Sequence, residues 1–269
     1  MKLKTILLSS LALILSLALC ACASKREGES TLETIKRRGK LVVATCPNYA
    51  PFEFQTLVDG KNKVVGADIE LAQALADELG VQLELSSMSF DNVLSSVQSG
   101  RSDLALASLS VTEERQKVFD FSEPYYETQN SILIKEKSRA NYSSIKDFAG
   151  KKVAVLKGSI QEGLAKDQLS QANIISLPAT GEAVNELKTG KVDAVYMEGP
   201  VAAGFVAQNK DLAQAQLQLP ASDGASLAIA FKKKQEDLKT VVNRVVRRVQ
   251  AKDDYNKYIQ KSIQLTAQP

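Results

Sequence analysis

Apolar residues recur along the chain with two periods that alternate. Segments with apolar residues three and four positions apart are typical of amphipathic helices, whereas short apolar or alternating runs are typical of strands. Gly39, Gly80 and Gly100 each follow a segment of helical period, where glycine commonly ends a helix. In order, the first half predicts a helix at 31–38, a strand at 41–45, a helix at 68–79, a strand at 81–85, a helix at 90–98 and a strand at 103–107.

The second half repeats this order. Its pattern predicts a strand at 152–156, a helix at about 159–169, a strand at 174–177, a helix at 181–188 and a strand at 192–196. The repetition is visible in the letters: VQSGRSDLALAS at 97–108 and LKTGKVDAVYME at 187–198 both run from a helix end through Gly and Asp into an apolar strand. Alternating strands and helices favour parallel sheets, so two such units predict two α/β lobes. Helices at about 235–250 and 253–263 follow and are expected to pack on one lobe.

Polar residues follow the apolar strands of both units. In open α/β sheets, ligands bind beyond the carboxyl ends of the strands. The rule places a set of such residues near one crevice: Ser108, Ser110, Gly158, Ser159 and Glu198.

The first residues have the pattern of an export signal. Lys2 and Lys4 precede an apolar stretch at 6–19, which is shorter than the roughly 20 residues that span a bilayer. The segment Leu19-Cys20-Ala21-Cys22 resembles a bacterial lipobox, in which a Cys after a small residue receives lipid. Cys22 fits this pattern better than Cys20 because Ala21 precedes it, and a plain cleaved signal is the alternative. We therefore expect a signal peptide at 1–21 and a linker at 22–30.

Composition narrows the possible functions. The chain is 44% hydrophobic and 24% charged, has a net charge of +3 and contains neither His nor Trp. A charge this close to balance gives no reason to expect nucleic acid. Without His the chain lacks the commonest metal ligand and general base. We expect no metal, no cofactor and no hydrolytic chemistry.

Several segments resemble one known family. They are GKLVVATCPNYAPFEF, GADIELAQALADELG, ASLSVTEERQKVFDFSEPYYE, GKKVAVLKGSIQE and VDAVYMEGPVA, which follow one another in the family's order and spacing. Together they resemble the polar amino-acid-binding proteins of ABC importers, the extracellular solute-binding proteins of family 3, over about residues 32–260. The resemblance implies a type II periplasmic-binding fold of two lobes, each a mostly parallel sheet flanked by helices. It places lobe 1 at 31–126 and 228–269, lobe 2 at 132–222, and hinge crossings at 127–131 and 223–227.

The resemblance also assigns roles in holding a free amino acid. Such a ligand presents a carboxylate, best held by a bidentate Arg, and an ammonium group, held by a carboxylate and neutral oxygens. Arg115 matches the family residue that pairs with the α-carboxylate, although a lone T-x-x-R is more often a surface helix start. Ser110 matches a residue that contacts the carboxylate and the ammonium, and Ser108 one whose carbonyl accepts from the ammonium. Ser159 resembles the second-lobe residue that completes the carboxylate site, a role compatible with that of a helix N-cap.

The remaining matches concern the ammonium and the ligand side chain. Glu198 stands where the family usually has Asp as the counter-ion of the ammonium, so its longer side chain implies a wider crevice or a water-mediated contact. Tyr49 and Phe90 match aromatic residues that flank the ligand side chain. Ile160 and Gln161 extend the second-lobe set, and Gln161 matches a position that reaches the ligand side chain in some members. Phe52 and Phe54 are expected in the core or at the lip of the site.

Cys46 departs from the family pattern. It occupies a position often filled by Asp, which in some relatives contacts a cationic side chain. Asp68 and Asp91 are acids that would compensate, although the stronger interpretation of each is a favourable helix N-terminal residue. Neutral polar and basic amino acids therefore both remain open as ligands.

Three functions are consistent with these observations. The first is a monomeric, lipid-anchored receptor on the extracytoplasmic face of the cell membrane that closes on an amino acid and docks on an ABC permease with its ATPase subunits. The second is an enzyme of the same fold, similar to a cyclic amino-acid dehydratase, for which Glu198, Lys157 and Cys46 are the candidate acids or bases. The third is an amino-acid sensor lipoprotein.

Overall fold

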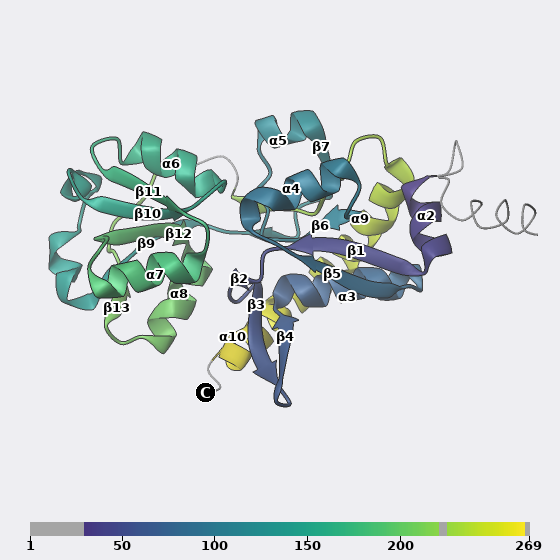
Figure 1. The fold of residues 1–269 in the computed structure, drawn as a ribbon, viewed down its shortest axis with the longest axis horizontal. Coiled ribbons are helices and arrows are strands. Elements are labelled where there is room, and N and C mark those ends of the chain that lie inside the picture. Colours follow the sequence, from purple (N-terminus) through teal and green to yellow (C-terminus); the bar gives the residue numbers. More distant parts are fainter. Residues whose placement is uncertain (1–29, 221–224, 267–269) are drawn as a thin grey trace, which may run out of the picture.

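The computed structural model describes residues 30–220 and 225–266. Within these residues the chain forms two lobes side by side, each built on a five-stranded sheet (Figure 1). No helix in this part of the chain is long and apolar enough to cross a membrane. The predicted signal peptide, with Cys20, and the predicted lipidation site Cys22 lie outside the described residues.

The sheet of the first lobe has the order β5-β1-β6-β15-β7. β1 runs parallel to β5 and β6, and β15 pairs antiparallel with β6 and β7, so four strands share one direction. The strands are β1 (Lys40–Thr45), β5 (Gln82–Ser87), β6 (Leu104–Ala105), β7 (Phe119–Phe121) and β15 (Ala230–Lys232). The helices are α2 (Thr31–Arg38), α3 (Ala67–Leu79), α4 (Phe90–Ser99), α5 (Glu113–Val118), α9 (Glu236–Ala251) and α10 (Asp254–Thr266). A small sheet of β2 (Asn48–Tyr49), β3 (Glu53–Val58) and β4 (Lys61–Val65) projects from it.

The second lobe repeats the arrangement in the order β11-β10-β12-β9-β13. β10 runs parallel to β11 and β12, and β9 is the reversed strand, antiparallel to β12 and β13. The strands are β9 (Asn130–Lys135), β10 (Lys152–Leu156), β11 (Asn173–Leu177), β12 (Ala194–Glu198) and β13 (Leu212–Gln214). The helices are α6 (Ile160–Gln168), α7 (Thr180–Thr189) and α8 (Gly199–Gln208), with short 3-10 turns η2 (Glu136–Asn141) and η3 (Ile145–Phe148).

The long helices form because their apolar residues fall on one face. In α9 the buried residues are Leu238, Val241, Val242, Val245, Val246 and Val249, spaced for one stripe of a helix. α4 and α7 each end at a glycine with positive φ, Gly100 at 77° and Gly190 at 82°. A glycine adopts this conformation without the steric cost of a Cβ, so it ends each helix and turns the chain towards the next strand.

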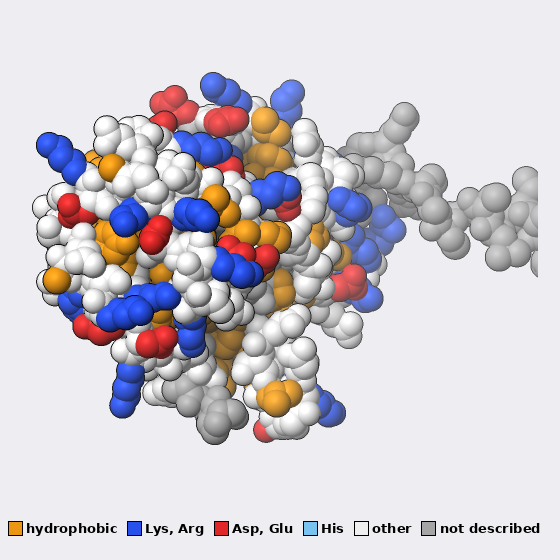
Figure 2. All heavy atoms as spheres, turned by 60° about the vertical axis from the view of Figure 1, so that its left-hand side comes forward, with side chains coloured by type: hydrophobic (Ala, Val, Ile, Leu, Met, Phe, Trp, Pro, Cys, Tyr) orange, Lys and Arg blue, Asp and Glu red, His pale blue; other side chains and the backbone are white. Residues whose placement is uncertain are grey.

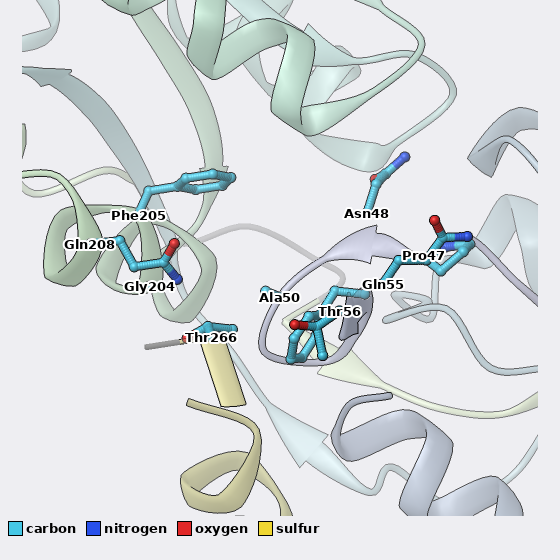
Figure 3. A pocket seen from close by; sticks show the side chains of 10 residues that line it. Pro47, Asn48, Ala50, Gln55, Thr56, Gly204, Phe205, Gln208 and Thr266 are labelled. Atoms are coloured by element: carbon cyan, nitrogen blue, oxygen red, sulfur yellow. The ribbon is translucent and has the colours of Figure 1, made fainter. Parts of the chain in front are cut away.

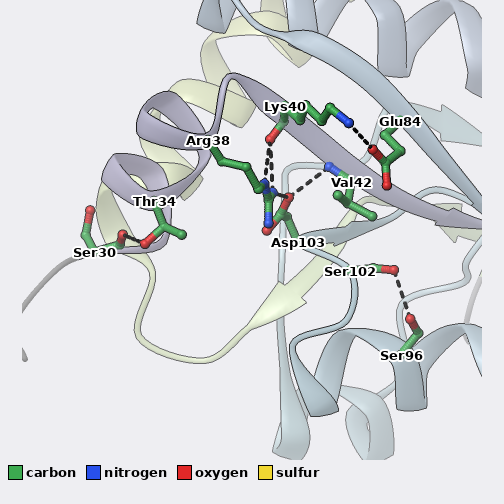
Figure 4. A network of polar contacts seen from close by, with 9 residues as sticks. All are labelled: Ser30, Thr34, Arg38, Lys40, Val42, Glu84, Ser96, Ser102 and Asp103. Carbon is green, nitrogen blue, oxygen red and sulfur yellow. Dashed lines mark hydrogen bonds and ion pairs between the residues drawn. The ribbon is translucent and has the colours of Figure 1, made fainter. Parts of the chain in front are cut away.

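One aspartate fixes the start of the strand that follows each of these helices. The backbone N–H of Asp103 donates to Val42, and its carboxylate accepts from the N–H of Val42 at 2.8 Å. Asp193 makes the same reciprocal pair with Lys152, at 2.9 Å for the carboxylate contact. Arg38 of α2 also reaches Asp103 (Figure 4). The Gly-x-x-Asp repeat in the sequence is therefore a device that sets the register between neighbouring parallel strands.

Two short strands join the lobes. β8 (Tyr126–Glu127) and β14 (Ser226–Leu227) pair antiparallel, and each leads into the reversed strand of one sheet, β9 and β15 respectively. Two crossings side by side are the arrangement that a two-lobed closing protein needs. The exact lobe and hinge boundaries remain a proposal, and residues 223 and 224 lie outside the described residues.

The structure also contains elements that the sequence pattern did not predict. β3 and β4 form a hairpin whose turn, Asp59-Gly60, has positive φ at both residues. An Asp-Gly pair between apolar runs is a strong hairpin signal, so this turn was predictable. The strand expected at 103–107 is shorter, covering Leu104–Ala105, because the chain bends towards the site after pairing with β1. On the face shown in Figure 2, basic and acidic side chains are interspersed.

Candidate functional site

A cavity lies between the lobes, where the carboxyl ends of the parallel strands meet. The lining residues from the first lobe are Cys46, Asn48, Tyr49, Glu53, Phe90 and Ser108, and those from the second lobe are Leu156, Ser159, Gln161 and Glu198. Six of the nine residues predicted from the sequence line this cavity. The other three, Ser110, Arg115 and Ile160, belong to segments that adjoin it.

Arg115 extends from the first lobe to the second. Its backbone N–H donates to the side chain of Thr112, the N-cap of α5. Nη1 donates to the carbonyl of Ser110 at 2.9 Å, and Nη2 donates across the cleft to the carbonyl of Gly158 at 3.3 Å. The guanidinium also lies 5.8 Å from the ring centre of Phe90. Burial lowers the pKa of this group, but Arg stays charged, so its other N–H donors are available to an anion.

Ser108 occupies a strained turn at the end of β6. Its φ is 49°, unusual for a residue with a side chain, and it is almost fully buried. Its backbone N–H donates to Asp68 at 2.8 Å, and its hydroxyl donates to Glu53 at 3.1 Å. Two acids from distant segments thus hold Ser108 in this conformation.

The N-terminus of α6 forms the second-lobe wall. The hydroxyl of Ser159 accepts from the N–H of Glu162 and donates to the carbonyl of Leu156 at 2.7 Å, so Ser159 is the N-cap of this helix. Ile160, half-buried, is its first residue, and the buried Gln161 donates to Asn130 at 2.9 Å. A helix N-terminus that opens into a cleft favours an anionic group.

Glu198 ends β12 and is 2% exposed. Its backbone N–H donates to the hydroxyl of Tyr49 across the cleft at 3.3 Å. Burial raises the pKa of its carboxyl to about 8, helped by the negative charge of Asp68 and opposed by Gln161 and Arg115. The ionised form of this buried carboxyl is poorly solvated. A hydrogen-bond donor or a cation placed beside it would therefore stabilise that form.

Three acceptor oxygens in the lining have no hydrogen-bond partner within the described part of the chain. They are Asn48 Oδ1, Glu53 Oε1 and Glu198 Oε2. Buried acceptors of this kind are rare, and they indicate a missing donor. Burial and the neighbouring charge of Asp68 also raise the pKa of Glu53 well above its usual range. The arrangement suits a ligand with several N–H donors and positive charge.

Glu53 was missed by the sequence reasoning, although a signal was present. It is 1% exposed and lies between Phe52 and Phe54, both buried. An acid inside a run of buried-type residues is costly unless it has a partner, and this makes it a candidate for function. Phe52 belongs to the core, one of the two places expected for it from the sequence. Phe54 lines a groove beside the cavity, which is described below.

Three further residues, Cys46, Asp68 and Asp91, were considered for contact with the ligand side chain, and they lie in different places. Cys46 lines the cavity, and burial raises its pKa to about 11, so the thiol stays neutral. Asp68 is buried behind Ser108 and does not line the cavity. Asp91 forms an ion pair with Lys157 of the other lobe at 2.9 Å, outside the cavity. Neither acid therefore replaces Cys46 directly. Within the described residues, no group of acids and cysteines is arranged to hold a metal ion.

A larger groove, of about 340 Å³, lies beside this cavity, between β2–β3 and α8 (Figure 3). Asn48 lines both. The groove is formed by Pro47, Asn48, Ala50, Phe54, Gln55, Thr56, Gly204, Phe205, Gln208 and Thr266, none of which is charged. It therefore offers no counter-ion for a carboxylate or an ammonium group, and the central cavity is the stronger site.

Comparison with known proteins identifies the family. The bacterial extracellular solute-binding proteins, family 3, match residues 41–264. The chain belongs to this family. This solute-binding protein is therefore one that acts outside the cytoplasm, and the type II periplasmic-binding fold predicted from the sequence is confirmed by its solved relatives.

Several relatives of this solute-binding protein are described by the ligand that they bind. It is 35% identical to the arginine-binding extracellular protein ArtP of Bacillus subtilis, over 86% of this chain and 87% of that one. It is 51% identical to the substrate-binding protein AbpA of Streptococcus pneumoniae bound to L-arginine, with a TM-score of 0.86, over 88% of this chain and 100% of that one. It is also 31% identical, with a TM-score of 0.80, to an ancestral amino acid-binding protein described as a precursor of cyclohexadienyl dehydratase, over 87% and 100% of the two chains.

Proposed function

We propose that this solute-binding protein captures free L-arginine between its lobes and delivers it to an ABC importer. The observation that carries the proposal is the set of unpartnered acceptors Asn48 Oδ1, Glu53 Oε1 and Glu198 Oε2 in one cavity. Two of them belong to carboxyl groups whose pKa is raised by burial. Arginine has an ammonium group and a guanidinium with five N–H donors, which together supply the missing positive charge and hydrogen bonds.

The two ends of the ligand meet different groups. Arg115, Ser110 and the N-terminus of α6 at Ser159 would hold the α-carboxylate, because they offer positive charge and N–H donors. Glu198 and the carbonyl of Ser108 would hold the α-ammonium group. These contacts are common to every amino acid and do not distinguish arginine from the rest.

The side chain would be selected at the opposite end. Tyr49 and Phe90 would flank its methylenes, and Gln161 completes the wall on the second lobe. Glu53 and Asn48 would accept from the guanidinium. Glu53 would thus supply the negative charge that the family often places at the position of Cys46. Of the two ligand classes that the sequence left open, neutral polar and basic amino acids, this charge favours the basic one. The arginine-bound relative supports the same choice.

Calorimetric titration with arginine and citrulline tests this function. Citrulline has nearly the same shape as arginine but a neutral side chain, so the comparison isolates the charge. We expect arginine to bind on the order of 100-fold more tightly, because a buried carboxylate left without its cation costs about 2–5 kcal/mol. Glu53→Gln should remove most of this preference, whereas Glu84→Gln on the exposed edge strand β5 should leave it unchanged. Equal affinity for the two ligands in the wild-type protein would exclude selection by charge.

The same proposal includes binding without catalysis. Glu198 acts as the counter-ion of the ligand rather than as a general acid, and Lys157 is exposed and paired with Asp91. Prolonged incubation with arginine should return the ligand unchanged in mass spectrometry. Conversion of arginine or of a cyclic amino acid would favour the dehydratase-like alternative instead.

We also propose that Cys22 carries a lipid that tethers the monomeric receptor to the extracytoplasmic face of the membrane, near the permease and ATPase subunits of its importer. The support is the lipobox-like segment Leu19-Cys20-Ala21-Cys22. Cys22→Ser should abolish labelling with a radioactive fatty acid and release the protein into the medium. Retention on the membrane would assign the tether to Cys20 or to another segment.

A further inference from the structure

One buried carboxylate lies directly behind the site without lining it. Asp68, at the start of α3, is fully buried and accepts hydrogen bonds from the backbone N–H of Ser108 at 2.8 Å, from the Tyr125 hydroxyl at 3.0 Å and from the Tyr255 hydroxyl at 2.5 Å. Ser108 in turn donates its hydroxyl to Glu53. One carboxylate therefore joins the floor of the site to the residue before the crossing strand β8 and to the C-terminal helix α10.

Asp68 and Glu53 both contact Ser108, whose backbone N–H donates to Asp68 at 2.8 Å and whose hydroxyl donates to Glu53 at 3.1 Å. Two buried carboxyl groups that contact the same residue lie too close for both to ionise without a counter-charge, so one of them retains a proton. Burial raises the pKa of both, and the charge of Asp68 raises that of Glu53 further. This is the behaviour of two buried carboxyls that share one proton, because both cannot ionise side by side in a poorly solvated site.

The groups around this pair are mostly neutral or negative. They are Cys46 after β1, Tyr49 on β2, Tyr125 before β8, Tyr255 on α10 and Glu198 at the end of β12. The positive charge of Arg115 acts on Glu198. Among the described residues, no Lys or Arg forms an ion pair or hydrogen bond with Glu53 or Asp68. A ligand cation would therefore be the direct counter-charge of the pair.

We propose that Asp68 is a positioning residue that holds Ser108 and shares one proton with Glu53, and that the cationic side chain of the ligand displaces this proton into solvent. This inference rests on the proposed selection of arginine by Glu53. Before binding, the pair holds one proton and one negative charge. After binding, the proton has passed to the buffer, the pair carries two negative charges, and the guanidinium supplies one positive charge. The net charge of the cluster is thus preserved.

The expected signature is a preference for arginine that depends on pH. Release of one proton per ligand makes the affinity rise roughly tenfold per pH unit, as long as the pair is protonated before binding. Glu198 is also protonated near neutral pH and would lose its proton to any amino acid, since every ligand brings an ammonium group. The ratio of the citrulline Kd to the arginine Kd cancels this common contribution. We expect this ratio to rise between about pH 6 and about pH 8, by up to roughly tenfold per unit.

Calorimetry of the full chain in buffers with different ionisation enthalpies measures the same proton directly. At about pH 7, arginine should release up to roughly one proton more than citrulline. Glu53→Gln should make the two ligands release equal numbers of protons. Asp68→Asn removes the charge that raises the pKa of Glu53, so the window of arginine-specific release should move to lower pH. Asp77→Asn, on the exposed end of the same helix, should behave as wild type.

These outcomes separate the inference from the function on which it rests. If arginine binds far more tightly than citrulline but with a ratio that does not change with pH, the proton-sharing pair is excluded and selection by charge survives. If arginine has no preference over citrulline, the proposed function itself is wrong. If Asp68→Asn fails to fold, the number of protons that arginine releases from the wild-type protein and from Glu53→Gln still tests the shared proton. A purely structural Asp68 would lower the melting temperature without moving the pH window.

Discussion

In the first lobe, the chain leaves α4 at Gly100, pairs Asp103 with β1 and then reaches Ser108. In the second lobe, it leaves α7 at Gly190, pairs Asp193 with β10 and reaches Glu198 at the same offset. The scaffold is the same, but the groups that it presents to the cleft differ. Ser108 is followed by Ser110 and by Arg115, whereas Glu198 is followed directly by α8.

The difference teaches where specificity is encoded in this fold. Glycine and aspartate fix the backbone of both lobes, so the residues beyond the strand ends are free to carry opposite charge. The first lobe supplies Arg115 and the second supplies Glu198, which match the two charged groups of an amino acid. The first lobe also supplies Glu53 from a hairpin that has no counterpart among the described elements of the second lobe.

Contacts across the cleft complete the comparison, because they exist only when the lobes are close. Arg115 donates to the carbonyl of Gly158, Lys157 pairs with Asp91, and the N–H of Glu198 donates to Tyr49. The following predictions ask how unequally the two lobes contribute to binding.

Arg115→Ala should have the largest effect. Removing one member of a buried charge pair costs about 2–5 kcal/mol, so arginine affinity should fall on the order of 100-fold or more in calorimetry. Arg101→Ala, an exposed position of the same lobe, is the matched control and should bind normally. Affinity within a few fold of wild type for Arg115→Ala would remove the first lobe's carboxylate contact from this account.

Glu198→Gln should weaken binding by roughly 10- to 100-fold, since a hydrogen bond to a charged group contributes about 1.5–3 kcal/mol. The effect should be smaller than that of Arg115→Ala, because Glu198 must first lose its proton near neutral pH. Binding of both arginine and citrulline should weaken, and titration with each ligand measures this.

The same variant has a consequence for stability without ligand. Between the unfolded pKa near 4.5 and the folded pKa of about 8, the folded state holds a proton on Glu198 that the unfolded state has lost. The free energy of unfolding should therefore decrease as pH rises through this window, by at most about 1.4 kcal/mol per unit. Urea denaturation should show a shallower decrease for Glu198→Gln. If the free energy of unfolding falls equally steeply with pH in Glu198→Gln and in the wild-type protein, the raised pKa does not belong to Glu198.

Gly158→Ala should weaken arginine binding by several fold. Gly158 has a φ of 77°, and a Cβ there would lie 3.2 Å from the Cβ of Asp91 on the other lobe. Gly150 has a similar φ of 71° but open space around it. Both alanine variants should lose roughly 1–2 kcal/mol of stability from backbone strain, and only Gly158→Ala should also impair binding. Equal binding by the two variants would mean that this contact does not limit closure.

Lys157→Ala should have the smallest effect. Its ion pair with Asp91 is exposed, and such pairs contribute about 0.2–1 kcal/mol, which corresponds to at most roughly fivefold in affinity. The loss should diminish at high salt. Lys166, equally exposed and paired with Glu162 inside the second lobe, provides the control. If Lys166→Ala weakens binding as much as Lys157→Ala, the contact across the cleft has no special role.

Much of this structure could be predicted locally. The helices ending at Gly39, Gly80, Gly100 and Gly190 were placed within a few residues, because apolar period and glycine stops are properties of short segments. The strands β9, β13 and β15 were missed, since each is defined by pairing with distant strands rather than by its own pattern. The family resemblance added the fold, which the solved relatives confirm.

The candidate site divides in the same way. Six predicted residues line the cavity, and Arg115 lies between the lobes, so strand ends and family position were good guides. Their ligand contacts remain predictions. Asp68 and Asp91 lie in the first turns of α3 and α4, which is the stronger of the two interpretations that the sequence offered for them. Neither lines the cavity, because Asp68 accepts from Ser108 behind it and Asp91 pairs with Lys157.

By itself the sequence determined the two repeated α/β units, the residues at their strand ends and the absence of histidine from the chain's chemistry. Only the tertiary structure decided which acids act together. Glu53, Asp68 and Glu198 come from three separate elements, and their electrostatic influence on one another depends on burial and distance. Neither quantity can be read from a local pattern, because desolvation and charge coupling arise when distant segments pack around one cavity.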